Sequence, residues 1–157
     1  MEYDIVVLTD HRYVAPHKKT PYIENVLQED QLVLEALENK GLKAIRKSWD
    51  DPNFDWLTTK YALFRTTWDY FDRYAEFSKW LEKASEHTQF INSKNLIYWN
   101  IDKHYLQDLS NSGITIPKTV FVEKGATLKL SDAVTKSKSE HGFISDSYIL
   151  KPCVSGA

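Results

Sequence analysis

The sequence predicts an open α/β sheet, because short apolar runs alternate with helical patterns along most of the chain. The first run, residues 5–9, is Ile-Val-Val-Leu-Thr, which is typical of a strand buried on both faces. A helical pattern follows over residues 29–40, and a second strand over residues 42–45. This order of strand, helix and strand favours two adjacent parallel strands. We therefore expect a mostly parallel sheet with helices on its faces.

The helix over residues 29–40 is predicted by one apolar stripe. Leu32, Val33, Ala36 and Leu37 recur at helical spacing. Gly41 follows at the position where a helix commonly ends.

The same alternation continues through the middle of the chain. Residues 61–64 form a third apolar run, and Phe77, Trp80, Leu81 and Ala84 then recur at helical spacing. Further on we expect a short helix starting near residue 55, a fourth strand over residues 90–92, and two short helices over residues 95–99 and 102–112.

The character of the sequence changes after Pro117. A strand is predicted over residues 119–122, a polar helix over residues 130–138 with Ser131 as its N-cap, and another strand over residues 148–151. We place a boundary here, which gives one domain over residues 1–117 and the start of a second over residues 118–157.

Composition narrows the class of protein. The chain has 157 residues, a net charge of −2 and one cysteine. The charge does not favour nucleic-acid binding, and no apolar stretch approaches the roughly 20 residues of a membrane span. A single cysteine fits a reducing compartment. We expect a cytoplasmic protein that binds neither nucleic acid nor membrane, and its oligomeric state stays open, a homo-oligomer included.

Polar residues follow two of the predicted strands. His11 and Arg12 come after the first strand, and Arg65 and Thr66 come after the third. Ligands of open α/β sheets bind beyond the carboxyl ends of the strands, so these four residues are candidates for substrate binding. Arg65 could hold a carboxylate through two parallel hydrogen bonds. The structural alternative is an ion pair between Arg65 and Asp69 or Asp72.

A second candidate site contains two lysines. Lys103 lies near the predicted start of a helix, where its charge could serve a polyphosphate. Lys151 ends an apolar run and precedes a loop that contains Ser155 and Gly156. Small residues let backbone N–H groups approach an anion closely. The alternative is that both lysines are ordinary solvated surface residues.

Cys153 shows no activating partner in the sequence, and we interpret it as a small core or loop residue. The histidines and the cysteine show no spacing typical of zinc ligands.

Several segments carry a family likeness. They are residues 49–51 (Trp-Asp-Asp) with 65–70 (Arg-Thr-Thr-Trp-Asp-Tyr), residues 99–106 (Trp-Asn-Ile-Asp-Lys-His-Tyr-Leu), and residues 149–156 (Ile-Leu-Lys-Pro-Cys-Val-Ser-Gly). Together these segments resemble the ATP-grasp ligases. The likeness is greatest to the bacterial branch called glutathione-synthetase-like, and it extends over essentially the whole chain.

The resemblance implies a Rossmann-like pre-ATP-grasp domain over residues 1–117 and the first elements of a truncated ATP-grasp domain over residues 118–157. It implies that Lys103 and Lys151 contact the phosphates of ATP, and that Ser155 and Gly156 begin the loop that closes over them. Arg65 and Thr66 fall where the family forms its acceptor-substrate site.

The implied reaction is ATP-dependent ligation of a small-molecule carboxylate to an amine through an acyl phosphate. The family takes its Mg²⁺ ligands from positions after the phosphate loop, so this chain alone is expected to be inactive. Two other functions compete with this one. The chain could be an inactive binding module that holds a small anion through Arg65 and His11, or an interaction domain that uses its aromatic residues.

Overall fold

The computed structural model describes residues 1–144 and 147–156. Its strands are β1 (Tyr3–Thr9), β2 (Ala44–Ser48), β3 (Thr59–Thr66) and β4 (Gln89–Ile91). Its helices are α1 (Pro21–Glu38), α2 (Tyr74–Ala84), α3 (Lys94–Ile101), α4 (Tyr105–Asn111) and α5 (Leu130–His141), with short 3₁₀ turns η1 (His11–Tyr13) and η2 (Trp56–Thr58).

The four strands form one parallel sheet in the order β2-β1-β3-β4. Strand β1, one of the two inner strands, is the most deeply buried, with Val6, Val7 and Leu8 all fully inaccessible. A strand covered on both faces needs apolar residues at successive positions rather than at alternate ones. The α/β class and the parallel sheet expected from the sequence are therefore confirmed.

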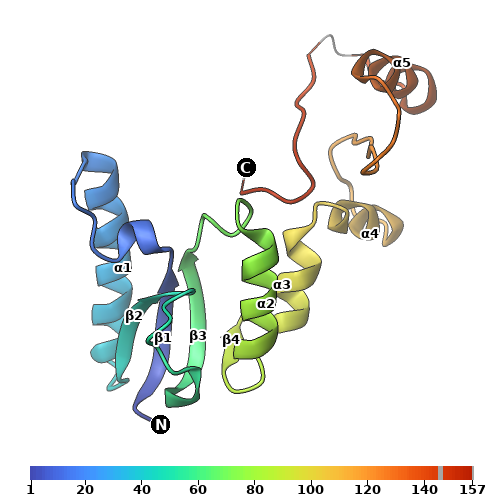
Figure 1. The fold of residues 1–157 in the computed structure, drawn as a ribbon. Coiled ribbons are helices and arrows are strands. Elements are labelled where there is room, and N and C mark those ends of the chain that lie inside the picture. The colour runs from blue at the N-terminus through green and yellow to red at the C-terminus, as the bar shows by residue number, and fades with distance from the viewer. Residues whose placement is uncertain (145–146, 157) are drawn as a thin grey trace. The chain divides into compact units, whose positions relative to one another are not determined.

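Helices cover both faces of this sheet, and two neighbouring residues of β3 show it. The ring of Phe64 contacts Phe77 and Trp80 of α2, whereas the guanidinium of the next residue, Arg65, approaches Asp30 of α1. Successive residues of a strand point to opposite faces, so α1 and α2 lie on opposite sides of the sheet (Figure 1).

An aromatic cluster joins α2 to its face of the sheet. The ring of Trp49 lies 5.3 Å from that of Phe77 and 5.6 Å from that of Trp80. Phe64 and Phe90, from β3 and β4, complete the cluster at 5.4 Å from each other. Tilted and edge-to-face rings at these distances pack favourably, so the cluster fixes α2 against the strands.

Helix α1 begins eight residues earlier than the sequence pattern predicts. Thr20 is its N-cap, with Oγ1 accepting a hydrogen bond from the Ile23 N–H at 3.3 Å, and Pro21 occupies the first turn. This pair is a common helix start. The predicted end is close, because the helix stops at Glu38 and Gly41 follows with a φ of 79°.

Two predicted strands are wrong. The structure shows no strand over residues 119–122 or 148–151. Isolated strands leave their N–H and C=O groups unpaired, and among the described residues no neighbouring strand runs beside either segment. The predicted N-cap of α5 is also wrong, because Lys129 occupies that position and Ser131 Oγ donates to Asp132 instead.

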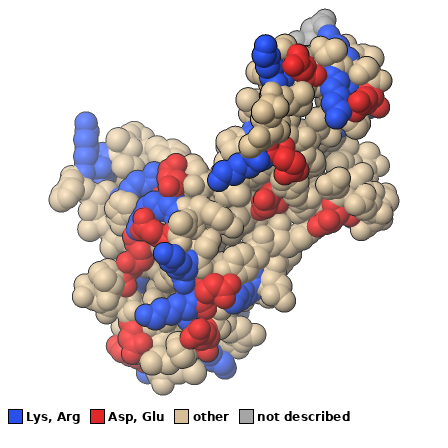
Figure 2. Space-filling view, turned by 45° about the vertical axis from the view of Figure 1, so that its right-hand side comes forward, with Lys and Arg blue, Asp and Glu red and all other residues tan. Residues whose placement is uncertain are grey.

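The chain divides into two compact units, one of residues 1–98 together with Gly156 and one of residues 99–155. The boundary near Pro117 inferred from the sequence remains a prediction. No helix in the described ranges combines the length and the apolar character needed to cross a bilayer. Acidic and basic side chains are interspersed over the face shown in Figure 2.

Candidate functional site

The carboxyl ends of β1 and β3 mark the point in the first unit where a ligand would be expected. The chain leaves β1 towards β2 on one side, and β3 pairs with β1 on the other side. Open α/β sheets bind ligands in the crevice at such a point. Thr9 and Thr66 face each other there, just after a register shift between Leu8 and Thr9.

Buried polar side chains gather at this edge. Thr9, Asp10, Thr66 and Asp69 are all less than 5% exposed. Thr66 Oγ1 lies 2.6 Å from Thr9 Oγ1 and 3.0 Å from Asp30 Oδ2. Burying a polar group is costly unless it finds a hydrogen-bond partner, and here the partners come from different elements.

Asp30 of α1 is the anionic centre of the group. Arg46 Nε donates to Asp30 Oδ2 at 2.7 Å, while the Arg46 Nη atoms donate to the Tyr13 carbonyl and to Thr9 Oγ1. Each of the three nitrogens of the Arg46 guanidinium therefore donates a hydrogen bond within the chain. Its guanidinium has a structural role and is not free for a ligand.

Arg65 also lies at this edge, and its guanidinium has N–H groups that can still donate to a ligand. Its Nε lies 3.7 Å from Asp30 Oδ1 and its Nη2 lies 3.6 Å from Glu29 Oε2. Both distances exceed those of hydrogen bonds, and the side chain is 35% exposed. Within the described chain Asp30 Oδ1 has no hydrogen-bond partner either. Asp69 and Asp72, the partners that the structural alternative named, are not the ones that Arg65 approaches.

His11 and Arg12 also lie at the carboxyl edge, on the turn η1. Asp10 caps this turn and binds Arg12 through its backbone N–H, its Nε and its Nη2, the last at 2.6 Å. The hydrogen bonds to Asp10 raise the pKa of Arg12. Arg12 is thus held by a buried carboxylate, whereas His11 is 61% exposed and lies 3.5 Å from Asp69.

Sequence reasoning missed a second charged group at this edge. Arg73 Nη1 donates to Asp50 Oδ2 at 2.5 Å and to Asp69 Oδ2 at 3.1 Å. Trp49 Nε1 donates to Asp69 Oδ1 at 2.7 Å, and the Arg73 guanidinium stacks over the Trp49 ring. Ser48 also donates to Asp50. These residues follow β2 and β3 closely in the sequence, and this position after the strands could have identified them as candidates.

The two parts of the second unit that resemble phosphate-binding motifs come together at Lys103. Lys103 Nζ donates to the carbonyl oxygen and to Oγ of Ser155, both at 3.0 Å. Lys103 N donates to the Cys153 carbonyl at 2.9 Å, and Asp102 forms an antiparallel bridge with Val154. Lys103 therefore lies in the turn between α3 and α4, two residues before α4.

The other residues of the predicted phosphate site are placed differently. Lys151 is exposed and lies outside any helix or strand. Gly156 groups with the first unit, so the structure does not join it to the contact between Lys103 and Ser155. Of the four residues, the structure brings together Lys103 and Ser155.

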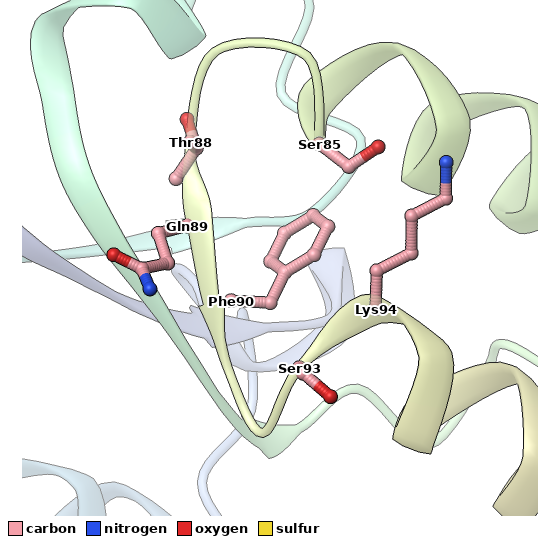
Figure 3. A pocket seen from close by; sticks show the side chains of 6 residues that line it. All are labelled: Ser85, Thr88, Gln89, Phe90, Ser93 and Lys94. Carbon is pink, nitrogen blue, oxygen red and sulfur yellow. The ribbon is translucent and has the colours of Figure 1, made fainter.

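A small pocket elsewhere in the first unit does not fit a ligand site (Figure 3). Its cavity of about 190 Å³ is lined by Ser85, Thr88, Gln89, Phe90, Ser93 and Lys94. Ligand pockets are usually larger, roughly 300–1,000 Å³. Two of its polar groups also have partners within the chain, because Lys94 binds Glu82 and Thr88 binds the Trp56 carbonyl.

The parallel α/β sheet with charged residues at its carboxyl edge is a pre-ATP-grasp-like fold, as expected from the sequence. The profile of the family "D-cycloserine synthetase DcsG, N-terminal domain" matches residues 5–92. The chain belongs to this family.

Two known proteins extend the comparison. The "Cycloserine biosynthesis protein DcsG" of Streptomyces lavendulae is 34% identical over 94 residues, which is 60% of this chain and 31% of that protein. The crystal structure of D-cycloserine synthetase DcsG superposes with a TM-score of 0.72 at 26% identity, covering 88% of this chain and 42% of the other. The chain thus spans less than half the length of either relative.

Proposed function

We propose that this chain supplies the acceptor-substrate region and part of the ATP-phosphate site of a ligase that joins a small-molecule carboxylate to an amine. The observation that carries the proposal is Arg65. Its side chain is exposed at the carboxyl edge of the sheet, and among the described residues its guanidinium is held by ion contacts of 3.6 and 3.7 Å. A substrate carboxylate can take up these spare donors in a bidentate pair.

The surrounding residues favour this role. Asp30 and Glu29 keep the guanidinium at the edge, and Arg46 already neutralises Asp30 through a 2.7 Å hydrogen bond. The charge of Arg65 is thus not cancelled by a tightly bound carboxylate. His11, exposed on η1, is a second group that could donate to an anion there.

In the second unit, Lys103 and Ser155 fit a phosphate group. An ammonium and a hydroxyl 3.0 Å apart present donors that can turn from each other to an anionic oxygen. When bound, ATP supplies the phosphoryl group that activates the carboxylate. Lys103 would counter the charge on the phosphate oxygens, and the resemblance adds Lys151 as a second lysine for the phosphates.

Mg²⁺, which this chemistry would also use, does not fit the four arginine-paired aspartates of the carboxyl edge. Mg²⁺ needs oxygen ligands in an octahedral arrangement. Asp10, Asp30, Asp50 and Asp69 each have an arginine within ion-pair distance. We therefore assign no Mg²⁺ ligand among them and derive no step through the ion.

The test is ATP-dependent release of phosphate by the protein that contains this chain, with a panel of small amino-acid carboxylates. Arg65→Gln should raise the KM for the active carboxylate about ten- to a hundred-fold, the cost of losing hydrogen bonds to a charged group. Lys103→Ala should weaken ATP binding and leave the carboxylate site intact. Lys79→Ala, on the exposed face of α2, is the matched control.

Two outcomes would contradict the proposal. If no carboxylate stimulates phosphate release and Lys103→Ala leaves nucleotide affinity unchanged, the ligase role fails. If Arg65→Gln abolishes binding of a small anion while Lys103→Ala changes nothing, the chain is instead the inactive binding module.

A further inference from the structure

The turn that carries Lys103 also carries two groups able to bind a metal ion. Asp102 lies directly after α3 and His104 is the N-cap of α4. The bridge between Asp102 and Val154, with the hydrogen bond from Lys103 N to the Cys153 carbonyl, holds the C-terminal segment against this turn. A carboxylate, an imidazole and a thiol thereby meet from segments about fifty residues apart.

The three groups are close enough to share one ion. A carboxylate oxygen of Asp102, a ring nitrogen of His104 and Sγ of Cys153 all lie within 4.8 Å of one another. Tetrahedral zinc bonds of about 2.0–2.3 Å place ligand atoms about 3.3–3.8 Å apart. Small side-chain rotations therefore suffice, and the backbone contacts that bring the segments together can stay as they are.

The donor set selects the kind of ion. Mg²⁺ and Ca²⁺ require oxygen ligands, whereas a set of one oxygen, one nitrogen and one sulfur suits a borderline-soft divalent ion such as Zn²⁺. When they bind an ion, the carboxylate and the thiolate would each carry a negative charge, and the imidazole would be neutral. An ion with three protein ligands retains one open position for water or a ligand.

Contacts on three sides position the ring of His104 beside the other two groups. Nδ1 lies 2.6 Å from Asp102 Oδ1, and Phe121 stacks on the ring at 4.4 Å. On the far side Nε2 is buried and lies 3.3 Å from Glu123 Oε1, without a hydrogen bond of good geometry among the described residues. Metal-bound histidines usually donate their other N–H to a carboxylate, which fixes the tautomer. Glu123 stands where such an acceptor belongs.

We propose that Asp102, His104 and Cys153 form a three-ligand site for a divalent transition-metal ion, with Zn²⁺ the best fit, and that Glu123 orients His104. The site does not depend on the ligase function. Because Lys103 lies between two of the ligands, a bound ion would fix the turn of Lys103 to the C-terminal segment.

The test uses Co²⁺ as a spectroscopic probe for the intact chain, followed by Zn²⁺ competition and calorimetry. One ion should bind per chain, with a thiolate-to-cobalt charge-transfer band in the near ultraviolet. Cys153→Ser should remove that band, and Asp102→Asn and His104→Gln should each weaken Zn²⁺ affinity at least tenfold. Glu123→Gln should weaken it about ten- to a hundred-fold while keeping the band, the usual effect of losing a carboxylate behind a ligand.

The matched controls lie on α5, where Asp132→Asn and His141→Gln change the same residue types outside the cluster. They should leave affinity and spectrum unchanged. A spectrum without a thiolate band, a band that persists in Cys153→Ser, or equal losses in the controls would overturn the proposal. The circular dichroism of each variant shows that it is folded before its affinity is compared.

Discussion

At the scale of single residues, Asp30 shows how a buried charge is tolerated. It is fully inaccessible, and it is neutralised by Arg46 through a 2.7 Å hydrogen bond and approached by Arg65 at 3.7 Å. The hydroxyl of Thr66 lies 3.0 Å from its Oδ2. One carboxylate thus organises cations from β2 and β3 around the end of the sheet.

Removal of this carboxylate should be strongly destabilising. Asp30→Ala leaves the largely buried Arg46 without its partner, and breaking one side of a buried ion pair costs about 3–5 kcal/mol. Urea unfolding monitored by tryptophan fluorescence measures the loss. Asp72→Ala, at an exposed position, should change the free energy of unfolding by less than about 0.5 kcal/mol. A loss below about 1 kcal/mol for Asp30→Ala would contradict the role assigned to it.

Arg73 should control the acid stability of the same edge. Burial raises the pKa of Asp50, but hydrogen bonds from Ser48 and Arg73 outweigh it, and the net shift is downward. A carboxyl with a lowered pKa stabilises the fold above its ordinary pKa of 3.8, and this stability is lost as the pH falls through the lowered value. Arg73→Gln should therefore move the acid-unfolding midpoint to higher pH.

The measurement is an acid titration followed by circular dichroism, and Lys79→Gln on the same helix is the control. An unchanged midpoint in Arg73→Gln would show that the ion pair between Arg73 and Asp50 contributes nothing to the acid stability.

The sequence predicted where single residues lie in the sheet, but it did not predict which residues they contact. Arg65 and Thr66 do lie at the carboxyl edge of the sheet, as the last two residues of β3 rather than after it, because the ends of parallel strands share one edge. Their partners could not be read from spacing. Glu29 and Asp30 lie more than thirty positions away, and they meet Arg65 only because α1 crosses that face.

At the scale of elements, the packing of α2 explains much of the first unit. Phe77 and Leu81 are buried on its inner side, one turn apart, and the ring of Phe77 contacts those of Trp49 and Phe64. The helix also positions Arg73 at its N-cap. The aromatic cluster and the charged edge therefore depend on the same helix.

Leu81→Ala should destabilise the protein by about 2–5 kcal/mol, because it opens a cavity in a fully buried position. Chemical unfolding measures the change, and Leu32→Ala on α1, whose side chain is 58% exposed, is the matched control. A loss for Leu81→Ala no larger than that of the control would show that α2 does not pack as described.

Element prediction worked where burial enforces the pattern. The apolar runs that became β1 and β3 were recognisable because both faces of these strands are covered. The runs at residues 119–122 and 148–151 each contain three apolar residues, yet no strand forms there. A strand requires a neighbour for its backbone, and sequence periodicity does not report whether that neighbour is present.

At the scale of the whole molecule, the two compact units differ in how well regular structure protects their backbones from proteolysis. The first contains the complete sheet, whereas residues 114–129 of the second lie outside helices and strands. Segments without ladder or helix bonds open at low free-energy cost. A protease should therefore cut the chain first within residues 114–129.

Limited proteolysis with trypsin, followed by mass spectrometry, checks this expectation. The first cuts should follow Lys124 or Lys129, which are exposed and outside regular structure. Lys60 is the internal control, because it is exposed but lies in β3. Early cleavage at Lys60 would contradict the expectation. If later cleavage leaves a stable fragment that ends at Lys118, the result would favour the boundary near Pro117. If the stable fragment ends at Lys103, the result would favour the division after Tyr98.

The pairing of β1 with β3 has a consequence for the order of folding. Thr9 and Thr66, which meet at the end of this pair, are 57 positions apart. Contacts between such distant positions form slowly, because a long loop must close before any of them contributes. During synthesis from the amino terminus, β1 remains an apolar segment with an unpaired edge until residue 66 has been made. The backbone hydrogen bonds of helix α1 are local, so this helix can form first. It can then cover one face of β1 before β3 has been made.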